Sequence, residues 1–452
     1  MANSRRRRDQ RQRQRHRAAE AARRNEIVKT VVQRLPAELH AEIHRRLDFL
    51  RRLAFASICG ASGHMLRQEA PWVVFPGLTE EKAIVVSMAE GPTASMRTSD
   101  LALLHRVVIG STDGWLVTAD KRACLRMANP ATGAQAALPA IDTIPFLHAT
   151  GGGSWFTLDL EPFLQVRFGG PPPPEDKDWG PYTPRSSTLT AAQMRQSFYR
   201  KVVLSASPQP GSYAAMLITD RHVGAPAFAT AEDKVWRMAR SPAGVEDAIH
   251  HDGRFYSVTY AGDVEAWERD AGTGEFTSKV VAPRLAGADD KLLRRKYLAV
   301  SPEGKLMAVC KHVKQVQQEL GQYGHQKTIL RVFFTVQVLD QAHGRWETAN
   351  VGDAALFVGV NSSLCVSKRE HPRVAAGCIH FTNDEVGDAC LRHALGSNNY
   401  QRSHGEPDDA ELRHTAVYIL KTGRTKRLLQ HIPGEGDNPR WPPPVWFTPS
   451  FL

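Results

Sequence analysis

"DGRFYSVTYAGDVEAWERDAGTG", residues 252–274, places two short runs rich in β-branched and aromatic residues between turn residues. Asp-Gly at 252–253 precedes the first run, Gly-Asp at 262–263 divides the two runs, and Thr-Gly at 273–274 follows the second. Such runs, bounded by glycine-containing turns, are typical of antiparallel β-hairpins. This stretch therefore predicts two strands joined by a tight turn.

The same pattern recurs along the chain at a nearly constant length. The hairpin above measures 21 residues from glycine to glycine, and the stretch from Gly114 to Gly133 measures 19. The stretch from Gly304 to Gly344 measures 40, but 22 remain when the polar insertion 311–328 is removed. Further strand–turn–strand units are expected at 201–218, at 225–239, and between Gly377 and Gly423 around the polar segment 385–414. Repetition over about 370 residues predicts a mainly β fold, a β-propeller of about seven or eight blades, with an array of β-sandwiches as the alternative.

A helix is predicted ahead of the strands, in "LPAELHAEIHRRLDFL", residues 35–50. At about 100° per residue, Leu39, Ile43 and Leu47 fall on one apolar stripe. Pro36 suits a first helical turn, where its missing N–H would have no partner in any case. Acidic residues come early and basic residues late, which suits the helix dipole. The stripe indicates a helix that docks on a partner.

The HAEIH core of this helix suggests a second interpretation, a zinc site. His40 and His44 stand four residues apart, as the two ligands of an HExxH protease motif do. In that motif the glutamate directly follows the first histidine, whereas Glu42 lies roughly 160–200° around the helix from both histidines. No third ligand stands at a recognisable spacing. The docking interpretation is therefore preferred, and no metal site is predicted.

The basic character of the chain belongs to its first residues. The net charge is +11, and residues 1–24 contribute ten arginines against Asp9 and Glu20, a net of +8. A segment of this composition has no apolar face and is expected to be disordered. It suits a nuclear-import signal, a contact with nucleic acid through residues 1–24, or a solvated tail.

Composition also bounds the class of protein. No apolar run approaches the roughly 20 residues that a membrane-spanning helix needs, and the start lacks the apolar core of a secretory signal. The six cysteines are scattered without a CxxC pair, which fits a reducing compartment. We expect no membrane association, and a location in the nucleus, the cytoplasm or both.

Residues 35–65, "LPAELHAEIHRRLDFLRRLAFASICGASGHM", resemble an F-box. The F-box is a three-helix module whose apolar ridges enter a groove on the Skp-type adaptor of a cullin ubiquitin ligase, a helix-in-groove contact. In F-boxes a Ser-Trp-Arg motif follows the cysteine, whereas Cys59 is followed by Gly-Ala-Ser-Gly-His, so a large apolar anchor is missing. The residues that match adaptor-docking positions are Leu35, Pro36, Leu39, Ile43, Leu47 and Leu53.

The following strands resemble one plant family. The blocks that match in order include "VIGSTDGWLVTAD" (108–120), "YRKVVLSASP" (199–208), "FATAEDKVWRM" (228–238), "DAIHHDGRFYSVTYAGDVEAWE" (247–268), "VGDAALFVGVNSSLCVS" (351–367) and "PPPVWFTPS" (442–450). They are similar to plant F-box proteins with a C-terminal KIB-type β-propeller. The resemblance implies an F-box-like helical module at 31–75 and a propeller at 76–452, and the disordered basic arm expected at 1–30 lies outside it.

The resemblance implies a receptor rather than an enzyme. In such a protein the helical module binds the Skp-type adaptor and cullin complex, and the propeller holds a target protein for ubiquitin transfer. The polar segments 311–328 and 385–414 are expected on the propeller rim as the target site. The alternative is a propeller scaffold that works without a ligase, which the missing tryptophan favours.

No catalytic constellation or cofactor site is predicted. In "GSTDG" (110–114) the serine stands one position too early for a nucleophile elbow. "GGGSW" (151–155) lacks the lysine of a phosphate loop. Cys378, His380, Cys390 and His393 fit no standard zinc spacing. A hydrolase with its site at the propeller centre would need paired carboxylates, which the sequence does not place.

Overall fold

The structure is a computed structural model, and it describes most of the chain. The described residues are 26, 29–47, 51–52, 55, 58–59, 69–79, 81–89, 91, 93–97, 101, 103–159, 186–221, 223–317, 328–384, 415–428 and 442–450. They belong to two compact units, Met1–Glu69 with Pro449–Leu452, and Ala70–Thr448. Residues 1–25 of the arm predicted to be disordered and the predicted target segment 385–414 lie outside the described residues, whereas Glu26 and residues 29–30 are helical.

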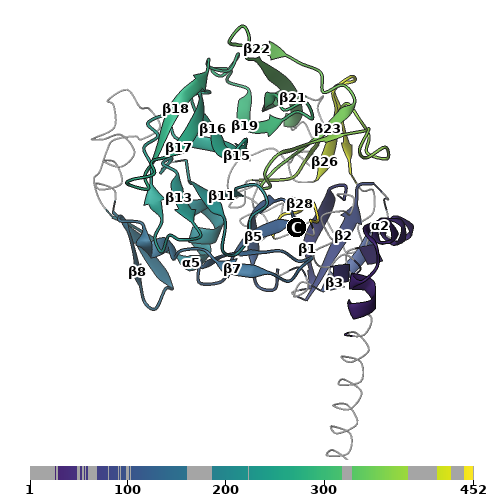
Figure 1. The fold of residues 1–452 in the computed structure, drawn as a ribbon. Coiled ribbons are helices and arrows are strands. Elements are labelled where there is room, and N and C mark those ends of the chain that lie inside the picture. Colours follow the sequence, from purple (N-terminus) through teal and green to yellow (C-terminus); the bar gives the residue numbers. More distant parts are fainter. Residues whose placement is uncertain are drawn as a thin grey trace, which may run out of the picture. The chain divides into compact units, whose positions relative to one another are not determined.

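Seven sheets make up the described part of the larger unit, and six of them are the blades of a propeller (Figure 1). The predicted mainly β propeller fold is confirmed. Blade 1 holds β1 (Trp72–Thr79), β2 (Lys82–Ser87), β3 (Thr93–Arg97) and β28 (Val445–Phe447). Blade 2 holds β4 (Val107–Thr112), β5 (Trp115–Ala119), β6 (Leu125–Ala128) and β7 (Gln135–Ala137). Blade 3 holds β11 (Tyr199–Leu204), β12 (Ala214–Thr219), β13 (Ala227–Thr230) and β14 (Arg237–Met238).

The remaining blades follow in chain order. Blade 4 holds β15 (Val245–His251), β16 (Arg254–Thr259), β17 (Val264–Arg269) and β18 (Phe276–Ala282). Blade 5 holds β19 (Leu293–Val300), β20 (Leu306–Gln317), β21 (Thr328–Asp340) and β22 (Arg345–Thr348). Blade 6 holds β23 (Ala354–Val358), β24 (Leu364–Ser367), β25 (Cys378–Phe381), β26 (Ala416–Ile419) and β27 (Arg424–Arg427).

The ring is closed by strands from opposite ends of the unit. β28 pairs antiparallel with β1, with Trp72 opposite Phe447 and Val74 opposite Val445. Blade 6 packs on this pair, since Phe357 contacts Trp446 edge to face at 5.0 Å between ring centroids. The first blade is therefore built from both ends of the propeller sequence.

The seventh sheet lies outside the ring. It consists of β8 (Leu147–Thr150), β9 (Trp155–Leu158) and β10 (Ser187–Thr190), between η2 (Ile141–Thr143) and the short helices α5 (Ala191–Gln193) and η4 (Met194–Phe198). β4 contacts β11 directly, so blades 2 and 3 are neighbours. A Cβ on Gly110 of β4 would lie 2.1 Å from the Val202 carbonyl oxygen of β11, a backbone approach that only glycine permits. Where seven or eight blades were expected, the described residues form six blades and an outer sheet.

The hairpins follow the sequence pattern closely. The stretch 252–274 forms β16 and β17, which pair antiparallel with Phe255 opposite Trp267. Gly262 turns between them at φ +91°, and a Cβ there would meet the Ala288 Cβ at 2.6 Å. The insertion 311–328 is partly regular, because β20 and β21 stay in register from Met307–Val338 out to Gln317–Thr328. Only residues 318–327 of it lie outside the described part.

Blade cores come from apolar strands whose side chains are buried on both faces. All five residues of β5 and of β23 are buried, as expected for inner and middle strands of packed blades. Trp115, Trp236 and Trp267 are at most 2% exposed, so they are packing residues of the blades. Trp346 is half-buried and donates its Nε1–H to the Pro283 carbonyl at 2.7 Å.

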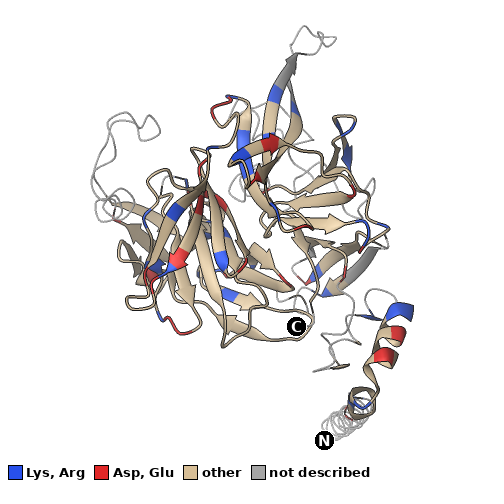
Figure 2. Cartoon of the chain, turned by 45° about the horizontal axis from the view of Figure 1, so that its top comes forward, with Lys and Arg blue, Asp and Glu red and all other residues tan. Residues whose placement is uncertain are grey.

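The smaller unit contains α2 (Ala37–Arg46), the helix expected at 35–50. The helix begins after Pro36, with Glu38 in its first turn and three basic residues in its last (Figure 2). It ends at Arg46, and Leu47 is extended at φ −80°, ψ 152°. No helix among the described residues is long and apolar enough to cross a membrane.

Candidate functional site

The buried side of α2 is built on its two histidines. His40 and His44 are 0% and 3% exposed. His40 donates its Nε2–H to the Val32 carbonyl at 2.6 Å and stands edge-on to Phe55. Burial, aided by the nearby Arg52 guanidinium, lowers the pKa of His44 to about 4. Both imidazoles therefore serve as packing groups of this unit.

The apolar stripe of α2 is not used for the same packing. Leu39 is 49% exposed, and Ile43 is half-buried. The two positions are separated by one helical turn, so their side chains lie on one face beside the histidine face. A helix that buries polar rings and exposes leucine reverses the usual preference of a surface helix. That reversal leaves an apolar face open to a partner.

The other predicted docking residues are placed as follows. Leu35 is half-buried and Pro36 is exposed, both immediately ahead of α2. Leu47 is half-buried just beyond its end, where its carbonyl accepts a hydrogen bond from Arg52 at 2.8 Å. Leu53 lies outside the described residues. The sequence brought these residues together on one helix, whereas the structure ends the helix before Leu47.

Glu42 points away from the histidines, as the helix geometry predicts. Its carboxylate binds Arg45 at 2.9 Å and Arg46 at 2.6 Å on the exposed side. These pairs at i,i+3 and i,i+4 hold the pKa of Glu42 below its usual range. A carboxylate engaged in this way does not face a water bound between His40 and His44. Among the described residues, no group of three His, Cys, Asp or Glu side chains is placed to hold a metal ion.

A second polar cluster lies inside the ring, on the inner strands of blades 3 to 5. Lys201 of β11 binds Asp247 of β15 at 2.5 Å, and Lys296 of β19 binds Glu246 of β15 at 2.6 Å. Arg295 of β19 donates to Asp384, which follows β25, at 2.9 Å. All are buried. Each contact joins one blade to the next, so the ionic cluster links blades 3 to 6 through buried ion pairs.

Backbone groups complete the partners of these carboxylates. Asp247 accepts the Leu298 N–H at 2.9 Å, and Glu246 accepts the Lys296 N–H at 3.0 Å. Burial raises the pKa of Asp247, and the attraction of Lys201 and Arg295 opposes that rise. At Asp384 burial also acts to raise the pKa, but Arg295, Lys311 and Arg200 together outweigh burial, so the pKa is lowered. Carboxylates that are this fully paired act as structural ions.

The segment that follows β23 in blade 6 reaches β4 in blade 2. The Ser362 N–H, in the segment after β23, donates to the Ser111 carbonyl of β4 at 2.8 Å. Blade 1 stands between blades 6 and 2 in the ring, so this hydrogen bond links two blades that are not neighbours. Asn361, 1% exposed, ties the same segment to the Phe357 carbonyl at 3.2 Å. Ser111 is itself 5% exposed within β4, which agrees with its rejection as a nucleophile.

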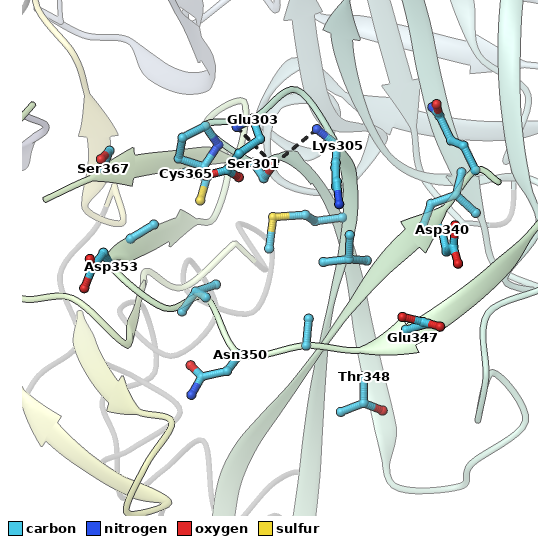
Figure 3. Close-up of a pocket in the computed structure, with 18 of the residues that line it drawn as sticks. Ser301, Glu303, Lys305, Asp340, Glu347, Thr348, Asn350, Asp353, Cys365 and Ser367 are labelled. Atoms are coloured by element: carbon cyan, nitrogen blue, oxygen red, sulfur yellow. Dashed lines mark hydrogen bonds between the residues drawn. The ribbon is translucent and has the colours of Figure 1, made fainter. Parts of the chain in front are cut away.

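A cleft of about 960 Å³ opens between blades 5 and 6 (Figure 3). Four turns or connections supply its walls, those at 301–305, 340–342, 347–353 and 367–370. Met307, Val338, Val351 and Ala354 form an apolar floor, and the first three belong to the core cluster shared by blades 5 and 6. Cys365 also lines it, and burial raises the pKa of its thiol to about 12, so it is no thiolate nucleophile at neutral pH.

The sequence did not predict this cleft. Its lining residues are spread from position 301 to 370, and each turn by itself looks like an ordinary hairpin loop. The one available signal was an excess of carboxylates in these turns. The excess of carboxylates indicates a site only once the two blades are known to lie side by side. The same holds for the ionic cluster, whose partners stand 46 and 89 residues apart in the chain.

The comparisons with known proteins agree with this architecture. The profile of the KIB1-4 beta-propeller family matches residues 85–409. An F-box protein of Arabidopsis thaliana is 24% identical over 245 residues, which are 52% of this chain and 53% of that protein. The chain thus spans about half the length of the curated relative that it matches.

Solved structures show only distant likeness. The Cps50 (Swd1) β-propeller domain of Myceliophthora thermophila is 8% identical, over 61% of this chain and 84% of that chain, with a TM-score of 0.26. AztD of Citrobacter koseri is 10% identical, over 62% and 94%, with a TM-score of 0.18. Scores this low say nothing about what this chain binds. The family profile covers well over half of the chain and falls on the described blades, so this protein belongs to the KIB1-4 beta-propeller family.

Proposed function

We propose that this protein is the substrate-recognition subunit of a Skp–cullin–F-box ubiquitin ligase. The observation that supports the proposal best is the orientation of α2, which buries His40 and His44 and leaves Leu39 about half exposed. The relationship to an F-box protein supports the same role. In this proposal Leu35, Pro36, Leu39, Ile43, Leu47 and Leu53 contact the Skp-type adaptor.

The physical basis is a helix-in-groove contact. An apolar side chain that is half exposed in the free protein gains about 1 kcal/mol when a partner covers it. Several such residues on one helix face give an anchor that depends on their spacing, which is how grooves select helices. The charged side of α2, with Glu42 paired to Arg45 and Arg46, stays toward solvent.

In the proposal the propeller contributes proximity and performs no chemistry. A rigid receptor holds a target lysine near the conjugating enzyme, which raises the effective concentration of the reacting groups. Burial raises the pKa of Cys310 to about 11 and that of Cys365 to about 12, so neither thiol is activated. The inward carboxylates are held by cations. These features support a non-catalytic role.

The first experiment is co-purification of the full chain with a Skp-type adaptor. The wild type should capture the adaptor, and the Ile43→Asp, Leu47→Asp double variant should lose it. Placing a charge in a docked apolar ridge costs several kcal/mol, a loss of at least about a hundredfold in affinity.

A matched control separates docking from folding. Val280 of β18 is 64% exposed in the propeller, so Val280→Asp adds a charge to an exposed apolar site far along the chain. This variant should capture the adaptor as the wild type does. A folded wild type that captures no adaptor would contradict the ligase role and favour the ligase-independent scaffold.

A further inference from the structure

We propose that the cleft between blades 5 and 6 binds a basic, extended peptide segment of a partner protein, with a lysine or arginine side chain inserted into it. This inference rests on the proposed receptor function, because it names the chemistry of the target. It is argued from the shape, the charge and the strand edges of the cleft.

The size of the cleft suits a peptide segment. Its volume of about 960 Å³ lies at the upper end of the range of about 300–1,000 Å³ that is usual for ligand sites. It therefore holds more than one side chain. Its labelled lining residues come from both blades and lie around the cleft (Figure 3).

The charge around the cleft is acidic. Five carboxylates line it against two cations, Lys305 and Arg369; the carboxylates are Glu303, Asp340, Glu347, Asp353 and Glu370. Residues 25–452 together carry a net charge of +3, since +8 of the +11 belongs to residues 1–24, so the excess of negative charge at the cleft is local. Such local reversal attracts a partner of opposite sign and rejects acidic ones.

Three of these carboxylates are available to a ligand. Asp340 is engaged by His343 at 2.5 Å, and Glu347 by Arg345 at 2.7 Å. Glu303, Asp353 and Glu370 are exposed and form no ion pair with the described residues. They come from three different turns around the rim, so a cation inserted between them meets carboxylates on several sides.

The floor of the cleft completes the match to a lysine or arginine. At its base Met307 is 2% exposed, and Val338, its cross-strand partner on the same face of the sheet, is half-buried. A long cationic side chain lays its aliphatic stem on such a surface and keeps its charged end at the rim. An apolar floor under an acidic rim is complementary to that side chain, and to neither a purely apolar nor an acidic one.

A sheet edge offers the main-chain contact. β22 is the outermost strand of blade 5, and Glu347 and Thr348 at its end line the cleft. Among the described strands, none pairs with the side of β22 that faces away from β21. An extended peptide can therefore hydrogen-bond to this edge while its side chains enter the cleft.

The test uses the purified full chain and labelled twelve-residue peptides in fluorescence anisotropy. The peptides share one sequence pattern and differ only in carrying lysine, glutamine or glutamate at alternate positions. The lysine peptide should bind at micromolar concentration, at least about tenfold more tightly than the other two, and more weakly as salt rises. Equal binding of the three peptides, or no binding of the lysine peptide, would overturn the proposal.

Two variants with the same change in charge locate the binding. The triple variant Glu303→Gln, Asp353→Asn, Glu370→Gln should lose about tenfold or more in affinity for the lysine peptide. The control variant Asp252→Asn, Glu275→Gln, Asp289→Asn neutralises three exposed carboxylates of the blade 4 region and should bind as the wild type does. Equal losses in both variants would show unspecific attraction and refute a site in the cleft.

A steric variant and the adaptor assay complete the design. Thr348 is exposed at the rim, so Thr348→Trp should block the cleft and weaken the peptide without a change in thermal stability. Unchanged affinity would contradict the site. The triple variant should still capture the adaptor, and a chain that binds peptide but no adaptor would refute the ligase role while leaving this inference intact.

Discussion

His380 of β25 is a titratable ring held without charge inside the propeller. It is 3% exposed, stacked on Phe357 at 4.4 Å and edge-on to Trp446 at 5.8 Å. Neither ring nitrogen has a hydrogen-bond partner among the described residues. Burial alone accordingly lowers its pKa to about 4.

This residue makes stability fall in acid. Between about pH 6.5 and pH 4 the unfolded chain binds a proton at His380 that the folded chain does not, so the free energy of unfolding decreases as pH falls. The full difference is up to about 3 kcal/mol. We expect His380→Phe to lose less stability than the wild type between pH 7 and pH 4.5 in urea titrations. The exposed His343 is the control, and His343→Gln should leave the wild-type decrease in place; an identical decrease in His380→Phe would contradict the assignment.

Gly110 lies where β4 of blade 2 and β11 of blade 3 are in direct contact. Because a Cβ would lie 2.1 Å from the Val202 carbonyl oxygen, Gly110→Ala must push β4 away from β11. Such overpacking costs about 1–3 kcal/mol or more. Gly211 has nothing within 4 Å of its Cβ position, so Gly211→Ala should leave the thermal midpoint nearly unchanged. Equal midpoints for the two variants would argue against the direct contact of the two strands.

At the scale of elements, the buried Lys201–Asp247 ion pair that joins β11 to β15 gives the clearest prediction. Lys201→Met leaves Asp247 buried without its cation, and the expected loss is about 3–5 kcal/mol in the free energy of unfolding. Adding Asp247→Asn should restore part of that loss, since the amide oxygen still accepts the Leu298 N–H and no charge remains. A double variant less stable than Lys201→Met would contradict the pairing.

On the helix α2, a substitution at an exposed position is expected to leave the stability of the protein nearly unchanged. Leu39 is 49% exposed, so Leu39→Asp should shift the thermal midpoint very little. His44 is 3% exposed, and His44→Asp should destabilise the same unit strongly. Adaptor capture should be lost in both, for different reasons that circular dichroism separates. A strongly destabilised Leu39→Asp would show that the stripe packs internally.

At the scale of the whole molecule, the sequence predicts what local residues determine. Turn positions such as Gly262 follow from backbone rules that act within a few residues. The blade count was expected from repetition over about 370 residues, whereas sheet β8–β10 takes up part of that length outside the ring, as the contact of β4 with β11 reveals. The parallel pairing of β23 with β25 likewise depends on where the intervening β24 returns. Long-range pairing of this kind leaves no periodic signal.

The candidate site shows the same division. The stripe on α2 was predicted because Leu39 and Ile43 are one turn apart, whereas the burial of His40 and His44 depends on residues as distant as Phe55 and Glu69. The cleft needed two blades to be placed first. Sequence reasoning therefore found the surface that lies on one helix and missed the one assembled from several turns.

The pairing of β28 with β1 can form only late in the synthesis of the chain. Trp72 leaves the ribosome 375 residues before its partner Phe447. At about 5–20 residues per second this interval is about 20–75 s. Throughout it the edge of β1 has no partner, and unpaired edges invite aggregation or chaperone binding. The helix α2 is made earlier still, so each nascent chain passes through a period in which α2 is complete while the ring of blades is still open.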